Sequence, residues 1–501
     1  MSETWDAIVI GAGIGGLTAA AYLVRAGKRV LVLDRNPHPG GTAYVYHRKG
    51  FSFPMGPLGF SSPEIIQNIL DDLGGGKELH FSRVHYRIRA FGLDLPVSLP
   101  FSELVLNFSA SFPPDAPSSE KFFKMVQDLG EKNSGLSASD YLHEHIKDWR
   151  LRRILGSIGT KEPYSSLPLL IAMWNLMSRE GIWYPREGMA SFCQRLGRVL
   201  PPCGEVRLNK HVTRIRVDHG RVVGVTLRNG MPIDAHAVIS NADYKQTFLK
   251  LINSTVLPPG WYQTVSEARQ TGSIFQVCLG VDLKKADFSL FEEADRVIYK
   301  RPGGGDDPPN WSDREVAPGV FASQELEVSL WGRNDRTVAP RGEAVIVIRT
   351  EAEYSHFTRF RSPNNRRISE YHDYKNRLGQ SLIHEIEDLM PGIGSAILER
   401  DIATPLTFEN QGGRSGGAVA GWSWDYEDFK DNQPKELIRT PIRGLYMAGY
   451  QAFSALFMGG VPTAMESGKR AAKAVFENAD PVDEILIPLS PSLPPETKGE
   501  G

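Results

Sequence analysis

Apolar and polar positions at the start of the chain follow three successive patterns, which predict a strand, a helix and a second strand. Residues 7–10 are apolar without interruption, as expected for a buried strand. Leu17, Ala20 and Val24 then recur at the spacing of one helix face. Residues 30–33 are again wholly apolar, which is typical of a parallel strand covered on both faces.

Three glycines join the first strand to the helix at the spacing G-x-G-x-x-G. Gly11 permits a tight turn, Gly13 lets the backbone approach a pyrophosphate, and Gly16 lets the helix pack closely on the strand. Phosphates would bind the N–H groups at the positive end of the helix dipole. Asp34 follows the second strand and can accept hydrogen bonds from ribose hydroxyls. The stretch predicts a dinucleotide-binding site.

Helix-start signals recur further along the chain. Ser62 and Pro63 predict an N-cap and a first helical position. Ser137 and Asp140 form a capping-box pattern that begins another helix. A third helix is expected over roughly 369–390.

The middle of the chain has a strand pattern. Residues 205–240 contain short β-branched runs separated by Asp-His-Gly and Asn-Gly turns, which predict antiparallel hairpins. Strand-like runs between 273 and 350 are interrupted by a Gly/Pro-rich loop around 303–309. Residues 444–476 predict a strand, a loop and a helix. The tail, residues 479–501, is rich in Pro, Ser and Glu and is expected to be disordered.

Length and charge limit the classes of protein to consider. A chain of 501 residues exceeds what one hydrophobic core usually supports, so we expect two domains. A formal net charge of −2 argues against nucleic acid as a partner. No apolar run approaches the ~20 residues of a membrane-spanning helix, although peripheral membrane contact stays open. The oligomeric state is not indicated.

The cysteines and the N-terminus predict a location. Cys193, Cys203 and Cys278 form no C-x-x-C pair, and an odd number cannot all pair with one another. We therefore expect a reducing, cytoplasmic setting, with membrane association possible. The first strand begins almost at once, so no cleaved signal peptide is expected.

Several further segments carry a resemblance to a known family. Gly40 and Gly41 form a Gly-Gly step after the second strand, and residues 49–57 read KGFSFPMGP. Residues 187–196 read EGMASFCQRL, and residues 239–243 read ISNAD. Together with APRGEAVIVI and GLYMAG…GGVPTAMESGKRAA, they resemble the FAD-dependent phytoene desaturases, carotenoid isomerases and retinol saturases.

The resemblance implies an α/β fold: a Rossmann-like FAD-binding domain of the GR2-type flavoproteins, with a discontinuous α+β substrate domain. Residues 1–75, 190–262 and 436–478 would form the FAD-binding domain, and residues 76–189 and 263–435 the substrate-binding domain. FAD is the implied cofactor, and no metal is expected. The implied cofactor-binding residues are Gly11, Ala12, Gly13, Ile14, Gly15, Gly16, Asp34, Arg35, Gly40, Gly41, Thr42, Gly56, Pro57, Val212, Asn241, Gly449, Tyr450, Gly460 and Val461.

The C-terminal motif agrees with FAD on physical grounds. FAD is longer than one strand–helix–strand unit can hold, so a second backbone segment must meet its flavin half. Gly449, Gly459 and Gly460 allow such a close approach. Two departures from the family pattern occur: Pro54 stands where relatives often carry Asp, and Tyr450 replaces the Asp of a Gly-Asp pair.

The catalytic side chains are not indicated, because bound FAD carries the hydride chemistry itself. His143 and His145 lie two apart, on different faces of a helix, so they do not predict a metal site. Ser415 fits a G-x-S-x-G pattern, but the last histidine, His384, precedes it, so we interpret it as a loop serine. Arg414 is interpreted as a solvated loop residue rather than one that faces the flavin.

Apolar segments outside the nucleotide motif suggest the substrate. Residues 99–112 and 167–177 are rich in Leu, Phe, Met and Trp, which suits a hydrocarbon tunnel or, equally, ordinary core helices. The resemblance favours hydride transfer between flavin and a lipophilic polyene or isoprenoid, by desaturation, saturation or isomerisation. The alternatives are a flavin amine oxidase and a non-enzymatic prenyl-lipid chaperone.

Overall fold

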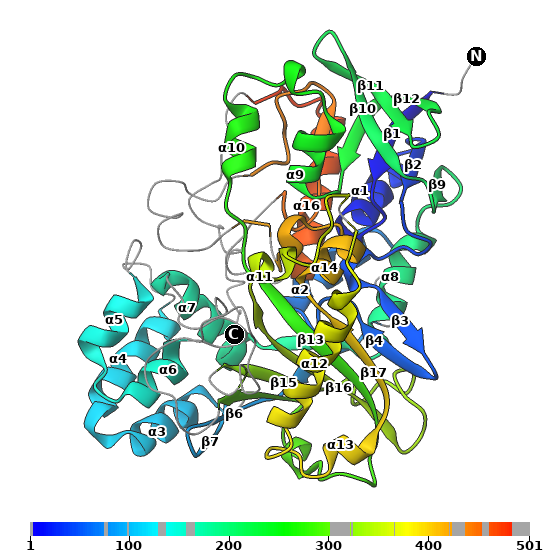
Figure 1. Ribbon diagram of the computed structural model, residues 1–501. Helices are drawn as coiled ribbons and strands as arrows, with labels where there is room; N and C mark the ends of the chain where they lie inside the picture. Colours follow the sequence, from blue (N-terminus) through cyan, green and yellow to red (C-terminus); the bar gives the residue numbers. More distant parts are fainter. Residues whose placement is uncertain are drawn as a thin grey trace.

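The computed structural model describes residues 4–74, 79–97, 100–128, 137–156, 166–300, 321, 324–364, 366–419, 421–422, 436–452 and 460–482. The loop predicted around 303–309, Gly459 and residues 483–501 of the predicted disordered tail lie outside these residues. Two large sheets occupy different halves of the molecule, and a group of helices lies beside the second (Figure 1).

The first sheet has seven strands and contains the N-terminal strand of the chain. Its strands, in the order β10-β11-β12-β1-β2-β9 with β18 beside β12, are β10 (Val212–Asp218), β11 (Arg221–Leu227), β12 (Pro232–Ser240), β1 (Trp5–Ile10), β2 (Val30–Leu33), β9 (Gly204–Arg207) and β18 (Leu445–Met447). β1 pairs in parallel with β2 and β12, and β18 is also parallel to β12. Both faces of β1 and β2 are buried, as their apolar runs require.

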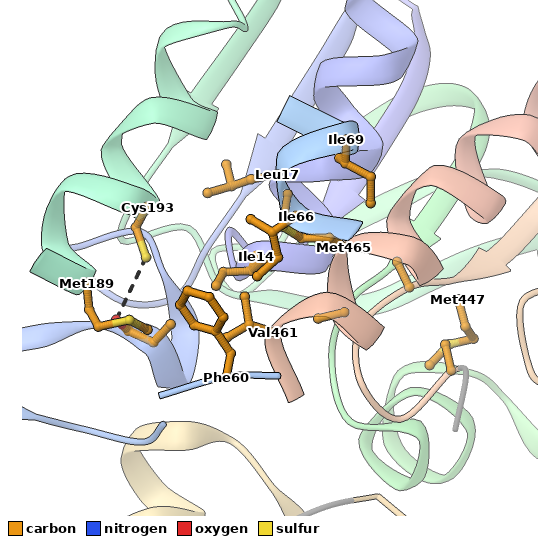
Figure 2. Packing of buried hydrophobic residues seen from close by; sticks show 14 of the residues in the cluster. Ile14, Leu17, Phe60, Ile66, Ile69, Met189, Cys193, Met447, Val461 and Met465 are labelled. Atoms are coloured by element: carbon orange, nitrogen blue, oxygen red, sulfur yellow. Dashed lines mark hydrogen bonds between the residues drawn. The ribbon is translucent and has the colours of Figure 1, made fainter. Parts of the chain in front are cut away.

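Two helices cross closely against this sheet: α1 (Ile14–Arg25) and α16 (Gly460–Phe476). A Cβ built on Gly468 of α16 would lie only 2.3 Å from the carbonyl oxygen of Gly15, so a larger residue would force the helices apart. Around the crossing, Figure 2 shows the packed side chains Ile14, Leu17, Phe60, Ile66, Ile69, Val461 and Met465. The C-terminal helix therefore packs in the same half of the protein as the N-terminal strand and helix.

The second sheet also has seven strands. In sheet order they are β17 (Ile397–Ala403), β13 (Ser273–Asp282), β16 (Glu343–Ala352), β15 (Leu326–Trp331), β14 (Arg296–Lys300), β6 (Tyr86–Ala90) and β7 (Leu93–Pro96). Neighbouring strands are antiparallel except β14 and β6. One face packs on α12 (Glu370–Glu385) through a separate apolar cluster.

A helical group surrounds Trp174, which is fully buried and donates a 2.9 Å hydrogen bond to the carbonyl of Leu155. Its helices are α3 (Phe101–Ser111), α4 (Ala116–Gln127), α5 (Ala138–His145), α6 (Trp149–Gly156) and α7 (Leu167–Asn175). Elements that join these layers include β3 (Val45–Arg48), β4 (Phe51–Pro54), α2 (Pro63–Asp72), β5 (Phe81–Val84), η3 (Leu176–Glu180), β8 (Ile182–Pro185), α8 (Gly188–Arg198), α9 (Tyr244–Gln246), η4 (Thr247–Leu251), α10 (Trp261–Glu267), α14 (Pro405–Gly412) and η7 (Ser415–Gly417). No helix among the described residues is long and apolar enough to cross a membrane.

The helix-start predictions have mixed outcomes. α2 begins at Pro63 as predicted, but the cap assigned to Ser62 is wrong: its backbone is left-handed and its side chain accepts no capping hydrogen bond. Ser137 does cap α5, because its hydroxyl accepts a 3.2 Å hydrogen bond from the N–H of Asp140. The helix predicted over 369–390 is shorter, since α12 ends at Glu385.

The hairpin prediction holds for β10, β11 and β12, which pair antiparallel. It is wrong for β9, which pairs in parallel with β2 at the sheet edge, because turn residues fix only local neighbours. The predicted α/β class is confirmed. All strands of the first sheet fall within the ranges predicted for the FAD-binding domain, but the domain boundaries themselves stay a prediction.

Candidate functional site

The glycine turn between β1 and α1 is held by Asp34. This buried carboxylate accepts hydrogen bonds of 2.7 Å from the backbone N–H groups of Ala12 and Asn36. Gly11 has a φ of +97°, a conformation that strongly favours glycine. A Cβ on Gly16 would lie 2.2 Å from the carbonyl oxygen of Gly11, so close packing requires glycine here.

Three glycine-bearing segments converge beside this turn. Gly13 forms an isolated parallel bridge with Gly40, and a Cβ on Gly15 would lie 2.7 Å from the backbone nitrogen of Gly449. Asn241 stands between them: its Nδ2 lies 2.7 Å from a Cβ built on Gly13, and its Oδ1 2.6 Å from one built on Gly449. The missing side chain of Gly13 thus makes room for Asn241, a neighbour that the sequence motif did not suggest.

A cavity of about 590 Å³ begins at this turn. Its volume is in the range of small-molecule and cofactor sites, roughly 300–1,000 Å³. All the predicted cofactor-binding residues line it except Ala12 and Gly16. Ala12 and Gly16 instead make the contacts within the glycine turn that are described above. Residues from the N-terminal turn, the hairpin strand β10 and the start of α16 therefore meet in one space.

Arg414 lines the cavity, which differs from its interpretation as a solvated loop residue. It is not a solvated loop residue: its guanidinium is partly buried and donates to the hydroxyl of Thr42 at 3.0 Å and to the carbonyls of Ala418 and Val419. Burial lowers its pKa from the usual value. Tyr450 lines the same space, and burial raises its pKa, so its phenol stays protonated. The hydrogen bond from Arg414 to Thr42 thus holds the loop that carries Arg414 against the turn at residues 40–42.

Asp243 fixes the other side of this loop. Its carboxylate accepts from the N–H and the hydroxyl of Ser415, at 3.0 and 2.9 Å, and from the side chain of Gln270 at 3.3 Å. It also caps α9 by accepting from the N–H of Gln246. Ser415 is thus a loop serine bonded to a carboxylate, as interpreted from the sequence.

One end of the cavity is apolar. Leu169 and Met173 of α7 line it together with Leu176, Ile182 and Met55. The tunnel role considered for residues 99–112 is not supported, because no described residue of α3 lines the cavity. Leu104 and Phe108 of α3 are instead buried in the core around Trp174.

Charged side chains on the second sheet also line the cavity, and the sequence did not single them out. Arg349 and Glu351 of β16 both line the cavity. Burial lowers the pKa of Arg349 to about 10, so it is charged at neutral pH. The signal was present in the run GEAVIVIRTEA, where two charges stand two residues apart at the end of an apolar strand.

Other nucleophile or metal chemistry finds little support. The three cysteines form no disulfide, and burial raises the pKa of both Cys193 and Cys278 to about 12. His143 and His145 each bond a helix carbonyl, at 2.8 and 3.0 Å. In the described part of the chain, no group of His, Cys, Asp or Glu side chains could hold a metal ion.

Comparison with known proteins agrees with this geometry. A family model described as flavin containing amine oxidoreductase matches residues 14–316. Among curated proteins, the chain is 25% identical to the inactive all-trans-retinol 13,14-reductase of Danio rerio, over 97% of this chain and 88% of that protein. It is 27% identical to the chloroplastic prolycopene isomerase of Daucus carota, over 90% and 77% of the two chains. It is 25% identical to the neurosporene-forming phytoene desaturase of Cereibacter sphaeroides, over 82% and 83%.

Solved structures show the same fold. The crystal structure of an oxidoreductase from Methanosarcina mazei superimposes with a TM-score of 0.66 and 17% identity, over 93% of this chain and 99% of that chain. At this identity the likeness supports the fold alone. It agrees with the α/β architecture of two large sheets described above.

Proposed function

We propose that this chain, which belongs to the family of flavin containing amine oxidoreductases, binds FAD in the cavity and acts on a long apolar polyene. Membership of this family and similarity to its enzymes identify the chain as a flavin-dependent oxidoreductase. The observation that carries the rest is that a single cavity is lined both by Asp34 and by Met173 of α7.

The shape and chemistry of the cavity support FAD rather than a shorter flavin. Asp34, Arg35 and Val212 line the end that would take the adenosine half, and Gly13 and Gly41 line the part that would take the pyrophosphate. Gly449 and Gly460 line the part proposed for the flavin half. A cofactor that lacked the adenosine half would leave the first of these groups without a ligand.

The apolar end supports a lipophilic substrate. Leu169, Met173 and Leu176 offer flexible apolar surface without hydrogen-bonding groups, which suits a hydrocarbon chain. Bound flavin supplies the hydride chemistry, while these side chains bind the substrate and exclude water. Two of the relatives named above act, by their names, on prolycopene and on phytoene, and the third is named as an inactive retinol reductase. Desaturation would pass a hydride from the substrate to the flavin, saturation would pass one from reduced flavin to the substrate, and isomerisation would leave the redox state of the flavin unchanged overall.

An amine is the less favoured substrate. Arg349 and Arg414 both line the cavity, and their guanidinium charges would repel a protonated amine. A non-enzymatic prenyl-lipid chaperone is less favoured, because the family model that matches the chain is that of flavin containing oxidoreductases.

An anaerobic experiment tests the proposal. Enzyme-bound flavin, oxidised or reduced beforehand, is mixed with phytoene, prolycopene or all-trans-retinol, and its absorbance is recorded; putrescine serves as the amine. We expect a polyene to change the absorbance spectrum of the flavin and putrescine to leave it unchanged. Met173→Trp should keep the flavin and lose the response to polyenes, whereas Leu106→Trp, at a position 65% exposed on α3, should keep both. Bleaching by putrescine alone would contradict the proposal.

A further inference from the structure

Arg349 of β16 is connected to the glycine turn by a short chain of contacts. One of its terminal nitrogens donates a hydrogen bond to the carbonyl of Gly56. Gly56 packs directly on Thr42, because a Cβ at residue 56 would clash with the carbonyl oxygen of Thr42. Gly41 lies against the glycine turn, since a Cβ at residue 41 would be 3.1 Å from the Cα of Gly13. All five residues line the cavity, so the contacts follow its wall from the turn to the Arg349 guanidinium.

The side chain of Arg349 is also held from the neighbouring strand. Its Nε donates a 2.7 Å hydrogen bond to Oε1 of Gln276, the residue directly opposite on β13. The side-chain nitrogen of Gln276 donates in turn to the carbonyl of Pro54 at 3.0 Å. An arginine has five N–H donors, and the second terminal nitrogen of Arg349, Nη1, makes no hydrogen bond to any described residue. Arg349 can therefore donate from a fixed position to a group in the cavity.

The charge of Arg349 has no close carboxylate partner. Among the residues that the structure describes, no carboxylate oxygen lies within 4.0 Å of its guanidinium nitrogens. Glu327 is directly opposite on β15, but its Oε1 lies 3.7 Å from Nη1 of Arg296. Glu351 also lines the cavity, outside that distance from Arg349. Removing a charge from water is costly, so a buried cation usually has an anionic partner. An anion in the cavity would supply it.

We propose that Arg349 lies beside the redox-active ring of the bound flavin and stabilises the negative charge that the ring gains on reduction. A hydride consists of two electrons and one proton, so its transfer converts the neutral oxidised ring into a singly charged anion. Gln276 is then a positioning residue, which holds the guanidinium in place. This inference rests on the proposed function and assigns one residue of this chain an electrostatic role in that site.

The other anion that Arg349 could bind is a carboxylate on the substrate. The contacts through Gly56 and Thr42 favour the cofactor, because they continue from the turn at which its phosphates are proposed to bind. Arg414 also lines the cavity, but both of its terminal nitrogens already donate to the protein. Arg349 is thus the cation that keeps a terminal nitrogen for a ligand.

Two measurements on the flavin-loaded protein report the negative charge on the ring without any substrate. The midpoint potential is measured against a reference dye during slow anaerobic reduction. Sulfite serves as a probe, because it adds reversibly to the oxidised ring, leaves it negatively charged and bleaches its absorbance. Arg349→Met should weaken sulfite binding about ten-fold or more, the value of one hydrogen bond to a charged group. A ten-fold loss of affinity for reduced relative to oxidised flavin lowers the midpoint potential by about 30 mV.

Variants around Arg349 separate an electrostatic role from a structural one. Arg349→Lys keeps the charge and should retain most of the sulfite affinity, whereas Gln276→Leu should give a smaller loss than Arg349→Met. Glu327→Gln removes a negative charge opposite Arg349, so it should raise the midpoint potential and strengthen sulfite binding. Its buried Oε1 has no hydrogen-bond partner among the described residues, so an amide should be tolerated there. Arg400→Met, at an exposed position on β17 of the same sheet, is the matched control and should change neither quantity.

The outcomes separate this inference from the function beneath it. If flavin-loaded Arg349→Met kept the potential and the sulfite affinity of the parent protein, the inference would be wrong and the proposed function would stand. The same two constants together with a loss of retinoic acid binding would assign Arg349 to a substrate carboxylate and also overturn it. Should Arg349→Met fail to fold, Glu327→Gln decides, because a lower or unchanged potential in that variant contradicts the inference. A folded chain that binds no flavin would overturn both proposals.

Discussion

The backbone N–H of Ala12 donates a 2.7 Å hydrogen bond to Oδ2 of Asp34, which ties the end of β2 to the glycine turn. The second carboxylate oxygen accepts from the N–H of Asn36. Asp34 therefore shapes the turn itself, in addition to the ribose contact that its position after the strand predicts. Loss of this carboxylate should affect the protein even without cofactor.

Asp34→Asn removes one of the two acceptors, because the amide nitrogen can only donate. We expect the flavin-free protein to lose about 1–3 kcal/mol of stability and the flavin content to fall. Thermal melting and the ratio of flavin absorbance to protein absorbance measure the two effects. Asp71→Asn, on the exposed side of α2, is the control. Full flavin content in Asp34→Asn would show that the carboxylate has no part in the site.

Gly16→Ala should destabilise the protein by about 3 kcal/mol or more, because its methyl would meet the carbonyl oxygen of Gly11 at 2.2 Å. Gly197→Ala in α8 is the matched substitution, since no heavy atom lies within 4 Å of the new methyl. It should stabilise the helix by about 0.5–1 kcal/mol. Chemical denaturation of both variants measures the difference. Similar stabilities would mean that α1 does not pack on β1 as described.

Arg414→Met should weaken flavin binding about ten-fold, because it removes the charged hydrogen bonds that hold the loop against Thr42. Thr42→Val loses one of these bonds and should have a smaller effect. Flavin titration into each flavin-free variant gives the dissociation constants. An unchanged dissociation constant for flavin in Arg414→Met would show that Arg414 does not contribute to flavin binding.

His38 makes the stability of the protein depend on pH. Burial lowers its pKa below the usual 6.5, and its ring stacks on Tyr44 with centroids 3.4 Å apart. The unfolded chain therefore binds a proton more readily, and stability falls as pH drops below about 6.5 towards the lowered folded value. His38→Phe keeps the stacking and removes the titration. The loss of melting temperature between about pH 7.5 and 5.5 should be smaller in this variant.

His219 provides the control for that experiment, because its side chain is 96% exposed. His219→Phe should leave the pH dependence of the melting temperature as it is in the parent protein. If His38→Phe and the parent protein lost the same number of degrees, the lowered pKa of His38 would not be the source of this pH dependence.

Lys300 and Glu325 form an ion pair with a 2.9 Å separation, and each side chain is only 2% exposed. Lys300→Met should cost about 3–5 kcal/mol, because it removes an ammonium group that lies 2.9 Å from a buried carboxylate. The double variant Lys300→Met/Glu325→Leu should recover most of that loss. Urea denaturation of the two variants measures it. A double variant as unstable as the single one would show that the pair is required for more than mutual neutralisation.

Much of the nucleotide half could be predicted from sequence, because its signals are local. The uninterrupted apolar runs gave β1 and β2, and the G-x-G-x-x-G spacing gave the turn between them. Asp34 was identified for the same reason, since it directly follows a strand. Each of these features depends on residues that are neighbours in the chain.

What the sequence could not supply depends on contacts between distant segments. Asn241 fills the space beside Gly13, and Asp243 holds a loop more than a hundred residues away. The Gly-rich sequence around Arg414 predicts a solvated loop, because such loops usually are. In the structure this loop instead packs against Thr42. β9 was assigned to a hairpin because no local pattern shows that a strand pairs with β2.

The central claim is that FAD binds along the cavity from Asp34 to Gly449, and an equilibrium titration tests it most directly. FAD and FMN are titrated separately into folded, flavin-free protein, with bound flavin followed by its absorbance and fluorescence. We predict that one FAD binds per chain and that FMN, which lacks the adenosine half, binds far more weakly. Equal affinity for FMN, or no affinity for either flavin, would contradict the assignment.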